Sequence, residues 1–286
     1  MSKAAEACGM PTLKAVKKNN GLGWQASQKK GEVRAIPLAN YLPALEPEHD
    51  KSKEYGVLIA NGKPVLVFDV NETLLDIDAL MPLFEGIFGR GEAMREWFAQ
   101  LVLYSQALSL AGRYAPFNVL GGAVLRMVGA THDLTISDDD VFALGAGIAA
   151  LPLHTDVANA LARLQDADFR LFTLTNSPAD HQADPLRRAG VAGLFERRFT
   201  VDAVRRFKPA HETYAMVARE LDLPAASMCM IAAHVWDTIG AQSAGWMAAL
   251  VTRPGNAALP LTGLAQPDFV GPDLPSIAEQ LLERWD

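Results

Sequence analysis

One short apolar run constrains the fold more than any other feature of this chain. Residues 65–68 read Val-Leu-Val-Phe, and Asp69 follows them directly. Such a run predicts a buried strand of a parallel sheet, with its acid at the carboxyl edge where open α/β sheets bind their ligands. The second position after Asp69 is Asn71, where a phosphoryl-transfer enzyme would need another carboxylate as general acid and base. The pattern therefore favours a nucleophilic carboxylate that serves a different reaction.

Strands and helices alternate along most of the chain. The apolar pattern predicts strands at 65–68, 169–174, 198–201, 227–232 and 247–251, and helices at 156–167, 179–190, 211–221, 237–245 and from 275 onward. This series predicts an α/β fold with a doubly wound parallel-sheet (Rossmann-like) core and helices on both faces of the sheet.

Residues 79–150 interrupt this alternation with helical patterns only. The predicted helices lie at 79–88, 91–111, 115–128 and 137–150. Trp97, Leu101 and Tyr104 stand at helical spacing in the second of them, which is typical of the buried face of a helical bundle. Ser137 and the three aspartates after it predict an N-cap and an acidic first turn rather than a metal site.

The composition limits the classes of partner. The 286 residues carry a formal net charge of −7, and half of them are hydrophobic, which is enough for a sizeable core. No apolar run is long enough to cross a membrane, and no basic stripe with interleaved aromatics marks a nucleic-acid surface. We therefore expect neither a membrane nor a nucleic acid as partner. The cysteines, Cys8 and Cys229, form no CxxC motif, and we expect a reducing, cytoplasmic compartment.

Residues 1–56 differ in composition from the rest of the chain. They carry nine Lys or Arg against six Asp or Glu and show no sustained periodicity. We predict a flexible N-terminal extension. Three alternatives stay open: a misassigned start, an added edge strand from Val33 to Leu42, and a targeting role, although the apolar segment of a signal peptide is lacking.

Three further motifs follow the first strand. Residues 171–178 read LFTLTNSP, residues 205–218 read RRFKPAHETYAMVA, and residues 230–246 read MIAAHVWDTIGAQSAGW. Together with residues 65–76, and in this order, they resemble motifs I to IV of the haloacid dehalogenase superfamily, and more narrowly its type II 2-haloacid dehalogenases. The resemblance extends over roughly residues 60–280.

The resemblance implies a domain organisation and a set of reactants. Residues 57–78 and 151–286 would form the Rossmann-like catalytic core, and residues 79–150 a helical cap that closes over the active site. The reactants would be a short 2-halocarboxylate and water, without a cofactor. The family also suggests a homodimer, with which the apolar cap helices are compatible.

Five residues are predicted to carry the reaction: Asp69, Lys208, Asp237, Thr73 and His234. Asp69 would displace a leaving group from carbon and form an ester. Thr73 would hold the rotamer of Asp69, and Lys208 would pair with Asp69 and Asp237 and keep both ionised. Asp237 would orient or activate the water that attacks the ester. The alternatives are a helix N-cap for Asp69 and for Asp237, a local turn hydroxyl for Thr73 and a surface lysine for Lys208.

Oxygen ligands for a metal ion are scarce in these motifs. Asn71 and Ala233 stand where metal-dependent relatives carry acids, so that only Asp69 and Asp237 remain. Because Mg²⁺ takes several oxygen ligands, Lys208 is the better counter-ion, and no metal site is expected.

Substrate contacts are predicted at strand ends and at aromatic positions. Thr175 and Asn176, at the end of a second parallel strand, suit a substrate carboxylate and a departing halide, although an ordinary strand-end turn is the alternative. Tyr214 either braces the site or fills the core. The predicted substrate-binding residues are Val70, Asn71, Thr175, Asn176, Trp97, Tyr104, Tyr214 and Trp236.

Four positions depart from the family pattern. Glu72 stands before Thr73 where the family usually has Gly, at a cost in backbone freedom. In motif IV the family reads Ser-x-Asn-x-x-Asp, whereas this chain has Ala232 and His234 in place of Ser and Asn. His234 would hold or deprotonate the water, since imidazole titrates near neutral pH, or it would be structural. In the cap, Phe98 follows the Trp after which the family often places an Arg.

The leading hypothesis is metal-independent hydrolysis of short L-2-haloacids to D-2-hydroxy acids through an aspartyl ester. The alternatives are a phosphatase of the same superfamily, a related hydrolase acting on another small carbon electrophile, and a degenerate non-enzymatic binding protein. The missing acids at Asn71 and Ala233 argue against a phosphatase. The retained Asp69, Lys208 and Asp237 argue against a binding protein.

Overall fold

The structure, a computed structural model, describes residues 12–18, 21–27, 62–179 and 184–285. The chain divides into two units, residues 1–49 and 50–286. In the first unit, β1 (Thr12–Lys18) pairs antiparallel with β2 (Gly21–Ser27). This hairpin was not predicted. The alternative strand at 33–42 lies outside the described residues, and the boundary at residue 56 stays a prediction.

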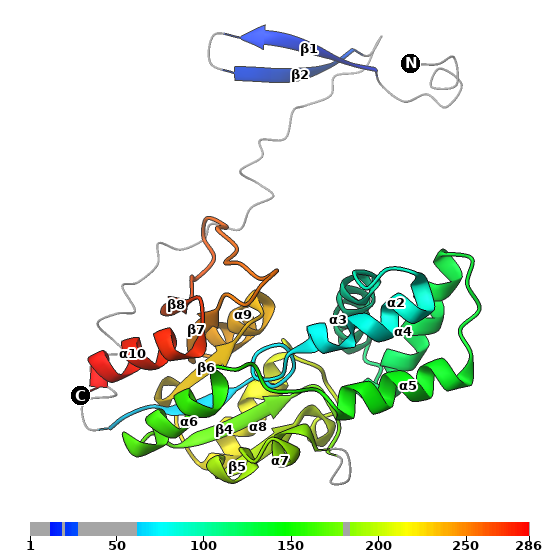
Figure 1. Cartoon of the computed structure of the whole chain (residues 1–286). Helices are drawn as coiled ribbons and strands as arrows, with labels where there is room; N and C mark the ends of the chain where they lie inside the picture. Colours follow the sequence, from blue (N-terminus) through cyan, green and yellow to red (C-terminus); the bar gives the residue numbers. More distant parts are fainter. Residues whose placement is uncertain (1–11, 19–20, 28–61, 180–183, 286) are drawn as a thin grey trace. The chain divides into compact units, whose positions relative to one another are not determined.

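A six-stranded parallel sheet forms the centre of the second unit (Figure 1). Its order is β5-β4-β3-β6-β7-β8. The strands are β3 (Val65–Phe68), β4 (Leu171–Thr175), β5 (Arg197–Thr200), β6 (Met228–Ala232), β7 (Met247–Val251) and β8 (Phe269–Gly271). The chain adds strands on one side of β3 and then, from β6, on the other. The strand order therefore reverses beside β3, which is where ligands bind in open sheets of this kind.

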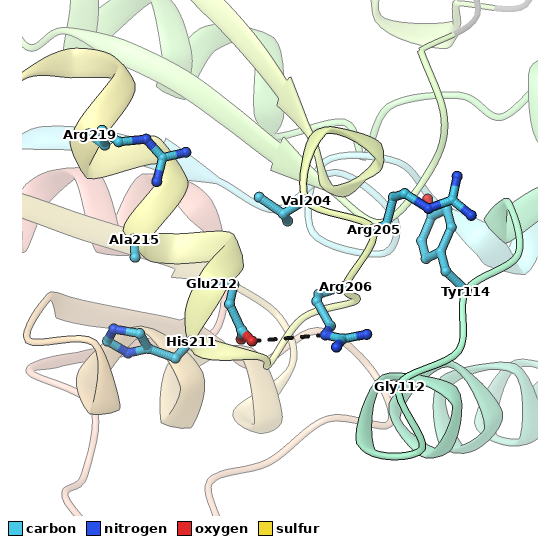
Figure 2. A pocket seen from close by; sticks show the side chains of 9 residues that line it. All are labelled: Gly112, Tyr114, Val204, Arg205, Arg206, His211, Glu212, Ala215 and Arg219. Carbon is cyan, nitrogen blue, oxygen red and sulfur yellow. Dashed lines mark ion pairs between the residues drawn. The ribbon is translucent and has the colours of Figure 1, made fainter.

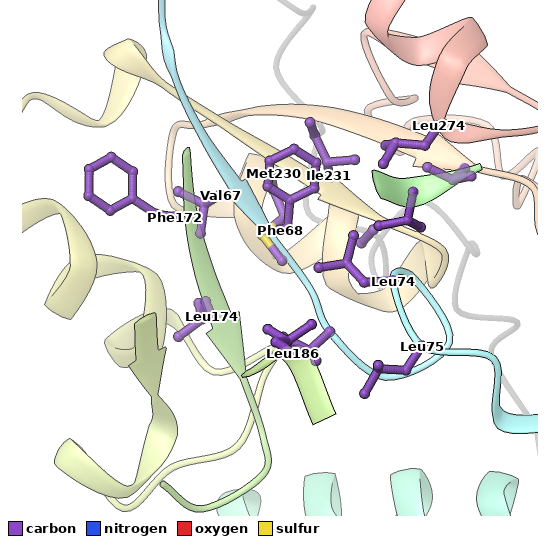
Figure 3. Packing of buried hydrophobic residues seen from close by; sticks show 14 of the residues in the cluster. Val67, Phe68, Leu74, Leu75, Phe172, Leu174, Leu186, Met230, Ile231 and Leu274 are labelled. Carbon is purple, nitrogen blue, oxygen red and sulfur yellow. The ribbon is translucent and has the colours of Figure 1, made fainter. Parts of the chain in front are cut away.

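The central strands are buried on both faces because both alternating sets of side chains are apolar. Val67 pairs in register with Phe172 of β4 and with Met230 of β6. These residues and their neighbours form one hydrophobic core (Figure 3), which also packs Leu74 and Leu75 of the turn after β3. The end of β3 is thus fixed from both sides, so the position of the next residue, Asp69, is fixed as well.

Two pairs of helices cover the sheet. The helix α6 (Val157–Asp166) packs on α10 (Leu274–Trp285), and α8 (His211–Leu221) packs on α9 (Val235–Ser243). Right-handed crossovers in both directions from β3 place these pairs on opposite faces. The predicted α/β doubly wound, Rossmann-like fold is confirmed.

Between β3 and α6 the chain forms helices only, which gather to one side of the sheet (Figure 1). They are the short η3 (Ile77–Leu80), α2 (Met81–Phe88), α3 (Ala93–Leu110), α4 (Phe117–Thr131) and α5 (Asp138–Ala149). Ser137 caps α5 and forms a capping box with Asp140, as predicted. We call η3 and α2–α5 the cap. Its boundaries with the core at 78/79 and 150/151 stay predictions.

Three elements differ from the sequence prediction. The helix predicted at 179–190 is the short α7 (Pro185–Arg188), because Pro185 fits the first turn and Asp184 caps it; residues 180–183 lie outside the described part. The helix α9 begins at Val235, so His234, and not Asp237, takes the N-cap position. The edge strand β8 was missed because it has only three residues. In the described part of the chain, no helix has the length and apolarity needed to span a membrane.

Candidate active site

Asp69 lies at the carboxyl end of β3 and is almost fully buried. The next residues form a tight turn in which the amides of Leu74 and Leu75 donate to the carbonyl of Val70. This turn brings the Thr73 hydroxyl to 2.8 Å from Asp69 Oδ2, to which it donates. The same hydroxyl accepts from the amide of Ala233, at 2.9 Å, just after β6. Thr73 therefore orients the Asp69 carboxylate and joins the ends of β3 and β6.

Lys208 supplies the positive charge next to Asp69. Its fully buried ammonium donates to Asp69 Oδ1 at 2.8 Å, to Asp237 Oδ2 at 2.6 Å and to the carbonyl of Leu174 at 2.9 Å. All three of its protons are thus hydrogen-bonded. The backbone amide of Lys208 donates to Asn176 Oδ1 at 3.0 Å, which fixes the loop that carries it.

The charges in this cluster support one another. Burial alone would raise the pKa of Asp69, but the charge of Lys208 and a contact from His234 outweigh it and hold that pKa well below its usual range. Burial would lower the pKa of Lys208, yet Asp237 and Asp69 raise it. Asp69 is therefore an ionised carboxylate in a desolvated site, which is the form a nucleophile needs.

Asp237 is completely buried within the cluster. It sits in the first turn of α9 and is fully buried. Tyr214, also fully buried on α8, donates from its hydroxyl to Asp237 Oδ1 at 2.6 Å, while Lys208 occupies Oδ2. Burial raises the pKa of Asp237 and nearby Asp69 adds to this, whereas Lys208 opposes it. Both carboxylate oxygens of Asp237 are hydrogen-bonded, and the residue has no solvent-exposed surface. Asp237 therefore holds Lys208 in place.

His234 faces Asp69 from the end of β6. Its Nε2 lies 2.7 Å from Glu72 Oε2, to which it donates. Its Nδ1 lies 3.4 Å from Asp69 Oδ2 and is buried without a hydrogen-bond partner. The ring stacks on Trp236 with centroids 5.0 Å apart, and Phe98 of the cap packs against it at 5.6 Å. Glu72 thus fixes the ring and leaves Nδ1 directed at Asp69.

Two carboxylates determine the charge of His234. Burial would lower the pKa of this imidazole, but the nearby carboxylates of Asp69 and Glu72 raise it to about 9. Burial would likewise raise the pKa of Glu72, but His234 and Arg95 lower it overall. An imidazolium therefore lies between two carboxylates at neutral pH.

The backbone of the turn and the cap complete this arrangement. Glu72 has a φ of 65°, in the left-handed region that favours glycine, which explains why a Gly is usual there. Arg95 of α3 donates to Glu72 Oε1 and, at 2.6 Å, to Asp78 Oδ1. The cap helix α3 is thereby joined to the turn that carries the nucleophile.

A family model now identifies the group of proteins to which this site belongs. The model for haloacid dehalogenase-like hydrolases matches residues 63–245, which include all the residues of the cluster. The chain belongs to this hydrolase family. The resemblance drawn from the four motifs is confirmed.

Several dehalogenases are similar to this chain in sequence and structure. An (S)-2-haloacid dehalogenase of Pseudomonas putida is 24% identical over 77% of this chain and 97% of its own length. One from Xanthobacter autotrophicus is 29% identical over 68% of this chain and 77% of its own. The solved L-2-haloacid dehalogenase from Xanthobacter autotrophicus with chloropropionic acid covalently bound superposes with a TM-score of 0.70 and 27% identity, covering 78% of this chain and all of that one.

In this haloacid dehalogenase-like hydrolase, the predicted substrate residues at strand ends lie beside Asp69. Asn71 Nδ2 donates to Ser177 Oγ at 3.0 Å, and the Thr175 hydroxyl accepts from the Ser177 amide at 3.1 Å. Val70 is buried in the turn after Asp69. These contacts join the loops after β3 and β4, so Asn71, Thr175 and Asn176 share one edge of the sheet.

The aromatic positions divide into two groups. Trp236 is half-buried, and the ammonium of Lys208 lies 5.7 Å from its ring centroid. Trp97 fills the interior of the cap and donates its indole N–H to the carbonyl of Gly121 at 2.9 Å. Tyr214 is fully buried and bonded to Asp237, which agrees with its alternative role as a brace of the site. The substrate roles of Trp97 and Tyr214 stay predictions. Tyr104 is 39% exposed on α3, and the structure does not join it to the cluster.

Sequence reasoning missed three side chains around the nucleophile. Glu72 was treated only as an awkward substitute for Gly, and Arg95 was overlooked. Arg253 was overlooked too: it is buried, pairs with Asp156 at 2.8 Å and donates to the carbonyl of Thr73 at 3.0 Å. The sequence did contain a signal for the Glu72–His234 contact. Glu72 stands at the family's Gly position and His234 at its Asn position, and an acid and a histidine that both depart from the family pattern can form a hydrogen-bonded pair.

Two other features lie near the cluster without joining it. His154 is half-buried with its Nε2 3.0 Å from the carbonyl of Glu72. A surface hollow of about 560 Å³ opens between the end of α3 and the start of α8 (Figure 2), where Arg206 lies 3.9 Å from Glu212. None of the cluster's residues lines this hollow, so we do not assign the reaction to it.

Proposed function

We propose that this protein is a hydrolytic dehalogenase that converts short L-2-haloacids to D-2-hydroxy acids without a metal ion. The observation that carries the proposal is the environment of Asp69. Its carboxylate is kept ionised by Lys208, oriented by Thr73 and faced by the unbonded Nδ1 of His234. The family and the names of the relatives support carbon–halogen bonds as the target.

In the first half-reaction, an oxygen of Asp69 attacks the α-carbon of the substrate. A carbon–oxygen bond forms, the carbon–halogen bond breaks, and the halide leaves with the bonding electrons. Attack from the side opposite the halide inverts the α-carbon. Asp69 loses its charge in this step because it becomes a neutral ester.

In the second half-reaction, water attacks the carbonyl carbon of the Asp69 ester. Loss of the charge on Asp69 removes one of the two carboxylates that raise the pKa of His234, so the imidazolium releases its Nδ1 proton to solvent. Neutral His234, held at Nε2 by Glu72, then accepts a proton from the attacking water at Nδ1. The tetrahedral intermediate collapses, the proton of its new hydroxyl passes to the departing alkoxide oxygen, and Asp69 is restored as a carboxylate. The hydroxy acid leaves, His234 is again protonated, and one proton has been released per halide.

This mechanism gives the water-activating role to His234 rather than to Asp237. The reason is that a water molecule cannot reach Asp237. Asp237 is fully buried with both oxygens bonded, whereas Nδ1 of His234 has no bond and points toward Asp69. Asp237 and Tyr214 position Lys208.

Lys208 takes the role that a metal ion has in related enzymes. Its ammonium lies between the two carboxylates that would otherwise share a cation, and Asn71 and Ala233 offer no further carboxylate. The proposed reaction therefore uses a permanent charge supplied by the chain. Assembly as a homodimer and a cytoplasmic location stay predictions.

Halide release is the direct test of this function. The protein, treated with EDTA, is given both hands of 2-chloropropionate, and p-nitrophenyl phosphate with Mg²⁺ serves as the comparison. We expect chloride and D-lactate from the L-substrate only, and no phosphatase activity. Phosphate release without chloride release would overturn the proposal.

Isotope labelling and a trapped ester test the mechanism. A single turnover in H₂¹⁸O should place ¹⁸O in Asp69 before it appears in the product, and Asp69→Asn should stop turnover. His234→Ala should slow ester hydrolysis by at least about 100-fold, the usual contribution of a general base, so that mass spectrometry detects the accumulated ester. Label that appears in the product of the first turnover would exclude the ester.

A further inference from the structure

The cap helix α3 contacts both members of the Glu72–His234 pair. Arg95 bonds to Glu72 Oε1 and to Asp78 Oδ1, and Phe98, one turn later, packs against the ring of His234 with centroids 5.6 Å apart. Arg95 is 34% exposed, whereas the carboxylate it reaches is buried. One helix outside the sheet therefore touches the proposed base and the group that orients it.

Glu72 is held at both oxygens. Oε1 accepts from Arg95, and Oε2 accepts from His234 at 2.7 Å. A carboxylate bonded on both sides cannot rotate freely, so the direction of its second bond, and with it the orientation of the imidazole, is fixed. Arg95 also shares the negative charge of Glu72, which weakens the attraction between Glu72 and a protonated His234.

We propose that Arg95 is a positioning residue of the hydrolytic half-reaction: through Glu72 it fixes the ring of His234 and limits how strongly this histidine holds its proton. The proposal rests on the role of His234 given above. Arg95 belongs to the cap, whereas Glu72 belongs to the turn after β3. The set of Arg95, Glu72 and His234 is therefore complete only when the cap contacts the core.

The other charges near His234 do not replace Arg95. Among the described residues, Arg95 is the one permanent cation in contact with the Glu72 carboxylate. Lys208 acts on the opposite side, through Asp69. The titratable and charged groups around His234 are Asp69, Glu72, Lys208, Asp237, Arg95, Asp78 and His154.

The test compares three variants. Arg95→Gln removes the cation, and Arg95→Lys keeps the charge without the two-pronged guanidinium. Arg90→Gln is the matched control, because Arg90 is also in the cap region but pairs at the surface with Glu96 at 3.0 Å. Two quantities are measured: the pH dependence of ester formation and hydrolysis in single turnovers, and the pKa of His234 by NMR titration of the substrate-free protein.

We expect Arg95→Gln to raise the pKa of His234 and to move the acidic limb of ester hydrolysis upward by about one pH unit, which is tenfold slower hydrolysis on that limb. Ester formation should keep the wild-type rate. Arg95→Lys should lie between wild type and Arg95→Gln, and Arg90→Gln should match wild type. If Arg95→Gln does not fold, the intermediate shift in Arg95→Lys decides.

A purely structural role for Arg95 would give a different result. Loss of cap packing would slow both half-reactions and leave the limb and the pKa of His234 where they are; that outcome overturns the proposal. If the wild-type protein releases no halide from any haloacid, the proposed function fails, but the NMR titration still decides whether Arg95 controls His234.

Discussion

At the scale of single residues, His234 has the environment that most alters its chemistry. It is buried between two aromatic rings, yet two carboxylates stabilise its protonated form. The pKa of such a histidine depends on the charge of its neighbours. In the proposed reaction Asp69 becomes a neutral ester, one of the two carboxylate charges is lost, and the same imidazole can act as a base.

The raised pKa of His234 should make stability depend on pH. The ordinary pKa is 6.5 and the folded-state pKa is about 9. The contribution is therefore fully present below about pH 6.5 and is lost as pH rises through about 9, by about 3 kcal/mol in total. We expect the difference in free energy of unfolding between wild type and His234→Asn, measured with urea, to shrink over this range. A difference that does not change with pH would contradict the assignment.

Glu72 combines a strained backbone with two ion pairs. Glu72→Gly should relieve the left-handed φ by about 1 kcal/mol but remove the group that holds His234. We expect ester formation to continue and ester hydrolysis to slow by about 100-fold, observed as a burst of halide followed by a slow phase. Equal slowing of both phases would show that Glu72 supports the turn alone.

At the scale of elements, the packing of α8 on α9 keeps the buried cluster in place. A Cβ atom on Gly240 of α9 would lie 2.4 Å from the hydroxyl of Tyr214 and 2.6 Å from Cβ of Pro209. The absence of a side chain at Gly240 thus lets Tyr214 reach Asp237. In the proposed mechanism α9 acts through this close approach, because Tyr214 holds Asp237, the partner of Lys208.

Gly240→Ala should disturb this contact. We expect a loss of about 1–3 kcal/mol in unfolding free energy from overpacking, together with slower ester formation as Lys208 shifts. Gly145→Ala in α5 is the control, since a Cβ there meets nothing within 4 Å, and it should be neutral or stabilising by up to about 1 kcal/mol. Thermal and urea unfolding with halide assays measure both effects. Similar behaviour of the two variants would refute the argument.

At the scale of the whole molecule, the reversal of strand order beside β3 brings distant segments together. Asp69 follows β3, Lys208 follows β5, and His234 follows β6. The charge of the active site therefore comes from the fold itself: Lys208 lies between two carboxylates that no local segment could bring together. This is the physical basis for proposing a reaction that needs no metal ion.

Chelation should therefore leave activity intact. We expect the same rate of halide release before and after exhaustive treatment with EDTA, and no gain from added Mg²⁺. Lys208→Met, which removes the charge at similar volume, should abolish activity and destabilise the fold by about 3–5 kcal/mol, because two carboxylates would remain buried without a cation. Rescue of the chelated protein by Mg²⁺ would disprove the role of Lys208.

The sequence by itself determined the parallel α/β core and the helical segment after β3, since apolar runs that end in polar residues mark strand ends and parallel strands share one edge. The pairing of Asp69 with Lys208 was implied by the resemblance to the family's motifs. Only the tertiary structure decided that Tyr214 is buried against Asp237, that both oxygens of Asp237 are bonded, and that Glu72 joins His234 to the cap. Glu72 and His234 are 162 residues apart. Such contacts depend on which side chains meet across the sheet and on how far each is buried, and no local pattern records either.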